Sequence, residues 1–82
     1  MTTRTRETAL IVLARVSGRH QSEIATDMDL VGDLGIDSPR ALELLLELEE
    51  ALGVEISDAE AAGMETVSDV LACAERLGSG LP

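Results

Sequence analysis

Ser38 is the residue of this chain best placed to do chemistry. It lies in the segment Gly35-Ile36-Asp37-Ser38-Pro39, beside a carboxylate and directly before a leucine-rich stretch. A serine that attacks a substrate needs an adjacent base, but the one histidine, His20, has no motif around it. The Gly-x-Ser-x-Gly motif of many hydrolases is also absent. The pattern therefore favours Ser38 as a point of covalent attachment, or as an ordinary helix cap, over a catalytic nucleophile.

Metal binding is the other chemistry that the residue types suggest, and the spacings argue against it. Asp27-x-Asp29 begins like a calcium loop, but Val31 would stand at its fifth position and Ser38 at its twelfth, where a bidentate glutamate is needed. A zinc site needs several thiolate or imidazole ligands, and the chain has one cysteine and one histidine. We expect no dedicated metal site, and we expect Cys73 to be a small core residue.

The elements that position Ser38 are predicted to be helices. The chain has no aromatic residue, so its core must be aliphatic, and leucine, methionine and alanine favour helices. A first helix is predicted from about Thr5 to Val16, followed by a connection over residues 17–37 that is long for a small domain. Apolar residues spaced along that connection should hold it against the core: Ile24, Met28, Leu30, Leu34 and Ile36.

The boundaries of the later helices follow from local capping signals. A second helix should run from Ser38 or Pro39 to about Leu52, with Asp37 or Ser38 as its cap. Ser57 and Glu60 form a capping box for a short helix over residues 58–62. The segment Thr66-Val67-Ser68-Asp69 should start a fourth helix that ends near residues 77–78. We therefore predict one all-α domain over residues 1–82, a four-helix bundle with an ordered core at about 5–77 and a frayed tail at 78–82.

The second helix has more leucines than one buried stripe requires. Its stripe consists of Ala41, Leu45, Leu48 and Leu52, widened by Leu44. Leu42 and Leu46 lie outside this stripe, close to Glu43, Glu49 and Glu50. They could belong to an exposed docking surface rimmed by carboxylates or to a helix that is buried on three sides. The glutamates favour the docking surface.

The charge of the chain limits its partners. The net charge is −10, and residues 23–60 carry twelve acids against Arg40 alone. Nucleic acid is therefore an unsuitable partner, whereas a basic protein surface is a suitable one. No apolar run is long enough to span a membrane, and no signal peptide is recognisable. The single cysteine cannot form an internal disulfide, so a cytoplasmic protein is expected. We also expect the chain to be a monomer.

The chain resembles acyl carrier proteins over roughly residues 8–77. The resemblance is carried by Asp33-Leu34-Gly35-Ile36-Asp37-Ser38, then Glu43-Leu44, Leu48-Glu49-Glu50, Glu55-Ile56 and Thr66-Val67, in the family's order and spacing. It implies the same four-helix bundle with a short third helix. It also implies a carrier rather than an enzyme.

The resemblance further implies a covalent cofactor and a set of partners. A phosphopantetheinyl transferase would move 4′-phosphopantetheine from coenzyme A onto Ser38, with Asp37 taking part in recognition. The arm would then present acyl groups, as thioesters, to an acyltransferase, a ketosynthase or other enzymes with basic docking patches. The positions that match the family's partner-binding residues are Pro39, Arg40, Leu42, Glu43, Leu46, Glu49 and Glu50.

Several positions depart from the family's pattern. Pro39 follows the serine where leucine is usual, Arg40 replaces a frequent acid, and Leu30 replaces a loop aromatic. These departures favour a free-standing carrier of a polyketide or other secondary pathway over the housekeeping fatty-acid carrier. An aminoacyl or peptidyl carrier is one alternative, and an acidic interaction domain without an arm is another. The alanines at 61, 62, 72 and 74 could leave a cleft for cargo or could pack the helices tightly.

Overall fold

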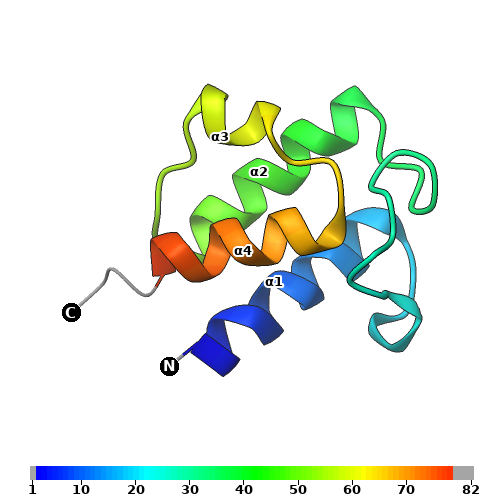
Figure 1. Ribbon diagram of the computed structural model, residues 1–82, viewed down its shortest axis with the longest axis horizontal. Coiled ribbons are helices and arrows are strands. Elements are labelled where there is room, and N and C mark those ends of the chain that lie inside the picture. The colour runs from blue at the N-terminus through cyan, green and yellow to red at the C-terminus, as the bar shows by residue number, and fades with distance from the viewer. Residues whose placement is uncertain (1, 79–82) are drawn as a thin grey trace.

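Four α-helices make up the fold over residues 2–78, which the computed structural model describes (Figure 1). They are α1 (Thr2–Ser17), α2 (Ser38–Leu52), α3 (Asp58–Ala62) and α4 (Val67–Gly78), with a short 3₁₀ helix, η1 (Gln21–Glu23), after α1. Within these residues there is no strand. The predicted all-α bundle with a short third helix is confirmed. The predicted tail lies, from residue 79 onward, outside the described residues.

The helices begin and end where local signals direct them, with one exception. Asp37 caps α2, and Gly53 ends it with φ of +67°, a left-handed conformation that favours glycine. The Ser57 and Glu60 capping box forms as predicted and starts α3 at Asp58. The exception is α1, which begins at Thr2 and not at Thr5. The prediction followed the apolar stripe, but a backbone helix can extend beyond the residues that it buries.

The core lies where α1 packs against both α2 and α4. In Figure 1, α1 lies along the bottom of the molecule, α4 crosses the middle and α3 lies at the top. The buried apolar side chains come from α1, α2, α4 and the long connection: Ala9, Val12, Leu13, Val16, Leu30, Leu34, Ile36, Leu44, Leu48, Val67, Val70, Leu71 and Ala74. No polar or charged residue is buried among the described residues. None of the described helices is long and apolar enough to cross a membrane.

The long connection between α1 and α2 is fastened to the start of α4. The Leu30 N–H donates to Glu65 O at 2.9 Å, and the Val67 N–H donates to Met28 O at 2.9 Å. Leu30, Leu34 and Ile36 insert into the core as predicted, while Ile24 and Met28 pack partly buried against it. The connection therefore delivers residues 37 and 38 to the start of α2 at a defined position.

Candidate functional site

Asp37 and Ser38 form the start of α2 with clearly different contacts. Asp37 is the N-cap: its carbonyl accepts from the Ala41 N–H at 2.7 Å, and its Oδ1 accepts from the Arg40 N–H at 3.2 Å. Ser38 is the first helical residue and is exposed. Within residues 2–78, its hydroxyl makes no hydrogen bond. The sequence left the cap open between these two residues, and the structure assigns it to Asp37.

The turn that leads to Ser38 is held from inside the molecule. Ile36 is buried, and its N–H donates to Leu30 O at 2.9 Å. Before it, Gly35 has φ of +66°, which a residue with a side chain rarely adopts. After it, Pro39 occupies the first turn of α2, where its missing N–H removes no helical hydrogen bond. A buried anchor and a rigid first turn thus present an exposed hydroxyl.

Leu42 and Leu46 extend an exposed face from Ser38 along α2. The three residues are spaced by four, which places them on one side of the helix. Leu42 is 60% exposed and Leu46 is 56% exposed, which is high for leucine. The buried residues of α2 are Leu44 and Leu48. Of the two interpretations of the surplus leucines, the helix buried on three sides is therefore wrong.

The carboxylates of α2 differ in how far they are engaged inside the molecule. Glu43 and Glu50 are exposed, and both stay available at the rim of the Leu42 and Leu46 face. Glu49 has its Oε2 at 2.7 Å from the Ile56 N–H, so it fastens the segment after α2. Glu47 pairs with Arg15 of α1 at 2.9 Å. Of the three glutamates predicted for the acidic rim, Glu43 and Glu50 are thus exposed, whereas Glu49 is engaged inside the molecule.

A shallow groove of about 450 Å³ lies at the C-terminal end of this face. It is lined by Leu46, Glu49, Glu50, Val54 and Glu55. The lining combines apolar side chains with three carboxylates, which suits the aliphatic stem and charged head of a lysine or arginine. Val54 and Glu55 are not among the predicted site residues, because their place beside Leu46 depends on how the chain turns at Gly53.

Arg40 lies in the first turn of α2 but does not belong to the acidic rim. Its Nη1 donates to Val16 O at 3.1 Å, across 24 residues of sequence. Its role in partner binding stays a prediction. The contact shows that one end of the guanidinium faces α1.

A small apolar cavity of about 80 Å³ lies beside α2, between the long connection and the residues around α3. Its lining includes Ile36, Ala41, Leu45, Ala61 and Met64. This volume is well below the roughly 300–1,000 Å³ of ligand pockets in proteins generally. Val31, which is 68% exposed, lies on its lining, and no pattern in the sequence marked it.

The alanines divide between packing and lining roles. Ala61 lines the small cavity, and Ala72 lines an open depression of about 280 Å³ between α3 and α4. Ala74 is buried in the core, whereas Ala62 is exposed. Neither of the two alternatives for these residues holds for all four.

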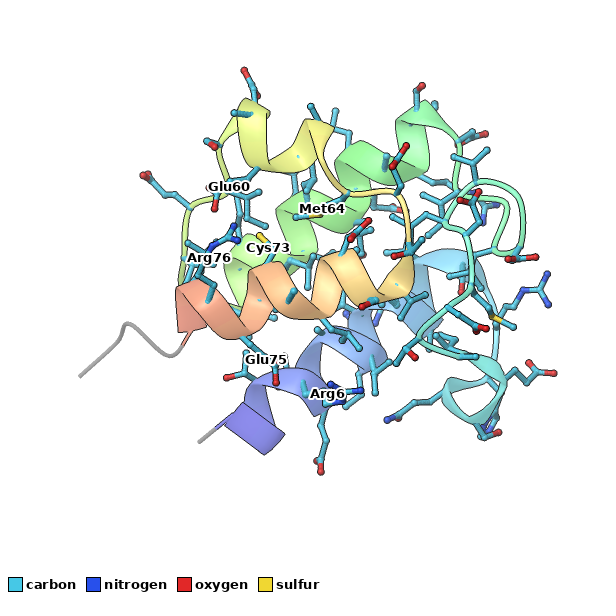
Figure 2. All side chains as sticks on the ribbon, viewed as in Figure 1. Arg6, Glu60, Met64, Cys73, Glu75 and Arg76 are labelled. Atoms are coloured by element: carbon cyan, nitrogen blue, oxygen red, sulfur yellow. The ribbon has the colours of Figure 1, made fainter. Side chains whose placement is uncertain are left out.

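The remaining candidates have structural roles. His20 is exposed and caps η1, where its Nδ1 accepts from the Ser22 N–H at 3.3 Å. Cys73 is buried as predicted, and it lies near Glu60 and Arg76 between α3 and α4 (Figure 2). Desolvation by burial, and to a lesser degree the charge of Glu60, raises the pKa of its thiol. Among the described residues, no group of three or more histidine, cysteine, aspartate or glutamate side chains could hold a metal ion.

Comparisons with known proteins agree on one family. The family described as the phosphopantetheine attachment site matches residues 9–74. The acyl carrier protein of Rhodococcus erythropolis is 35% identical over 66 residues, which are 80% of this chain and 72% of that protein. The meromycolate extension acyl carrier protein of Mycobacterium tuberculosis is 38% identical over 66 residues, 80% of this chain and 57% of its own length. Its counterpart in Mycolicibacterium smegmatis is 36% identical, with 67% of its length covered.

Proposed function

The chain belongs to the phosphopantetheine-attachment family of acyl carrier proteins, and we propose that Ser38 is the residue through which it holds its 4′-phosphopantetheine. Members of this family are carriers and not enzymes. The observation that supports Ser38 most directly is that its side chain has no part in holding the helix together. Asp37 caps α2 in its place, which leaves the Ser38 hydroxyl exposed and without a hydrogen bond in residues 2–78.

The surroundings of Ser38 fit such a group. No side chain covers the residue, so a long arm can leave the surface without displacing the core. The start of α2 bears the positive end of the helix dipole, which favours an anionic phosphodiester. When bound, the group supplies a thiol that holds acyl chains as thioesters. The chain itself contributes a fixed hydroxyl and a surface for docking.

The docking surface is proposed to be the Leu42 and Leu46 face with its rim of Glu43 and Glu50. An apolar strip that continues from Ser38 would bring a partner's active site close to the arm. The carboxylates would steer and orient a basic patch on the partner, an effect that acts mainly on association rates. Glu49 would contribute charge to this rim while its Oε2 remains bonded to the Ile56 N–H.

The partners are proposed to be a phosphopantetheinyl transferase, which installs the arm, and enzymes that load and extend acyl chains, such as an acyltransferase or a ketosynthase. The pathway is proposed to be acyl chain building of the fatty-acid or polyketide type. The names of the relatives, which include meromycolate extension carriers, support a fatty-acid type. Pro39 and Arg40, which depart from the family's usual residues, favour a specialised pathway.

Intact-mass measurement with a broad-specificity phosphopantetheinyl transferase and coenzyme A tests the attachment site. The parent protein should gain the mass of one phosphopantetheine, and Ser38→Ala should gain none. Ser68→Ala is the matched control, because Ser68 is likewise an exposed serine near the start of a helix, and it should be modified like the parent. Modification of Ser38→Ala, or loss of modification in Ser68→Ala, would contradict the proposal.

The same modified protein can be used to test the cargo. An acyltransferase with an acyl-coenzyme A donor should load the arm, whereas an enzyme that activates amino acids as adenylates should not. Loading by the adenylating enzyme alone would instead identify an aminoacyl or peptidyl carrier.

A further inference from the structure

Arg40 is in an unfavourable place as far as α2 alone is concerned. It is the only basic residue between positions 23 and 60, and it lies in the first turn of the helix. The N-terminal end of a helix carries partial positive charge, which favours acids there and disfavours an arginine. An interaction outside α2 should therefore account for its position.

That interaction is with the opposite kind of helix end. Arg40 Nη1 donates to Val16 O at 3.1 Å, in a partly buried contact. Val16 lies in the last turn of α1, where carbonyl groups lack intrahelical partners and carry partial negative charge. The guanidinium donates a hydrogen bond to such a carbonyl group, and its positive charge offsets the partial negative charge there. The cation that is misplaced on α2 is thus well placed for α1.

The contact lies next to the proposed attachment site. On one side of Ser38, the Asp37 carboxylate accepts from the Arg40 N–H and fixes the first turn along the helix axis. On the other side, the Arg40 side chain fixes the same turn sideways against α1. Ser38 therefore lies between two residues, Asp37 and Arg40, whose contacts fix the first turn of α2.

We propose that Arg40 is a positioning residue for Ser38, which holds the first turn of α2 against the end of α1 so that the hydroxyl is presented in one orientation. This inference rests on the proposed role of Ser38. Transfer of a group onto a hydroxyl depends steeply on the placement of the reacting atoms. A loosened turn should therefore slow attachment even though no contact with the transferase is lost.

A role in docking alone predicts the opposite result. Arg40 lies beside a face proposed to meet basic partners, so as a docking residue it would oppose their approach. Removing its charge would then lower the KM for the carrier and leave the free protein unchanged. Positioning instead predicts a change in the free protein and a fall in kcat.

The test combines hydrogen exchange of the free, unmodified protein with transferase kinetics. In Arg40→Gln the side chain is uncharged and too short to reach Val16 O. In Arg40→Lys the ammonium group can still donate to that carbonyl. Arg6→Gln is the control, because it makes the same charge change near the N-terminal end of α1 (Figure 2). Residue-resolved amide exchange by NMR is followed for residues 40–42.

In Arg40→Gln, loss of one charge-assisted hydrogen bond should speed exchange of these amides about three- to tenfold. The kcat for attachment should fall by about three- to tenfold, with Arg40→Lys recovering both and Arg6→Gln changing neither. Exchange within twofold of the parent, or a lower KM with unchanged kcat, would overturn the proposal. If the parent is never modified, the function of Ser38 is wrong, while the exchange data still decide whether Arg40 holds the turn.

Discussion

At the scale of single residues, Asp37 and Ser38 show how neighbouring side chains divide two tasks. Asp37 caps α2 through the Arg40 N–H, whereas Ser38 leaves its hydroxyl in solvent. Asp37→Ala should therefore lower the free energy of unfolding by about 1 kcal/mol, the usual loss for a helix cap. Ser38→Ala should change it by less than about 0.5 kcal/mol, as for most surface substitutions. Urea unfolding followed by circular dichroism measures both, and equal losses would show that Ser38 shares the cap.

The same residues mark how far sequence reasoning about the site extends. The position of Ser38 at the start of a helix could be predicted, because Asp37 and Pro39 are local signals. The choice of cap could not, since aspartate and serine are both good caps. The internal contacts of Arg40 and Glu49 could not be predicted from the sequence either. Their partners depend on where α1 and the segment after α2 lie in space. The predicted partner-binding roles of these two residues stay predictions.

At the scale of elements, α3 is the α-helix held least by packing, since none of its residues is buried. It is joined to α4 by an ion pair of Glu60 with Arg76 at 2.8 Å. This bond, together with those from the Ser57 N–H and hydroxyl, lowers the pKa of Glu60 from its ordinary value of 4.5. The ionised Glu60 carboxylate therefore stabilises the folded protein fully above about pH 4.5, and this stabilisation is lost as the pH falls through the lowered pKa.

An NMR titration of the Glu60 carboxyl carbon tests this connection. The midpoint in the parent should lie below 4.5, and it should rise in Arg76→Gln, since the bond to Arg76 is the main cause of the shift. Glu60→Gln should destabilise the protein at pH 7, and the difference from the parent should shrink toward pH 3. Glutamine keeps the capping-box function, so the loss reports on the charge. A midpoint that does not move in Arg76→Gln would show that Ser57 alone lowers the pKa.

Element boundaries were predicted well because each depends on a few neighbouring residues, such as the Ser57 and Glu60 box of α3. The face that α2 buries was predicted less well. In α2 the fully buried residues are Leu44 and Leu48, whereas Ala41, Leu45 and Leu52 are only partly buried. The leucines of α2 occupy more than one side of the helix, and only the positions of α1 and α4 decide which side is covered.

At the scale of the whole molecule, some acidic side chains are paired with arginines, whereas those beside the Leu42 and Leu46 face are not, in the part of the chain that the structure describes. Arg15 and Arg76 pair with Glu47 and Glu60, which neutralises those acids locally. The exposed Glu43 and Glu50 remain beside the apolar face of α2. Part of the net charge of −10 thus lies where a partner would approach the arm.

Docking should therefore weaken as salt screens these charges. The distance over which charges act falls from about 10 Å at 0.1 M salt to about 3 Å at 1 M, so the Kd for the transferase should rise about tenfold or more, mainly through slower association. The Glu43→Gln/Glu50→Gln variant should bind more weakly at 0.1 M and respond less to salt. The control Asp27→Asn/Glu65→Gln makes the same charge change at exposed positions outside α2, and it should behave like the parent. If the Kd were unchanged or lower at 1 M, burial of the Leu42 and Leu46 face would drive docking, because salt does not screen apolar contacts and can strengthen them.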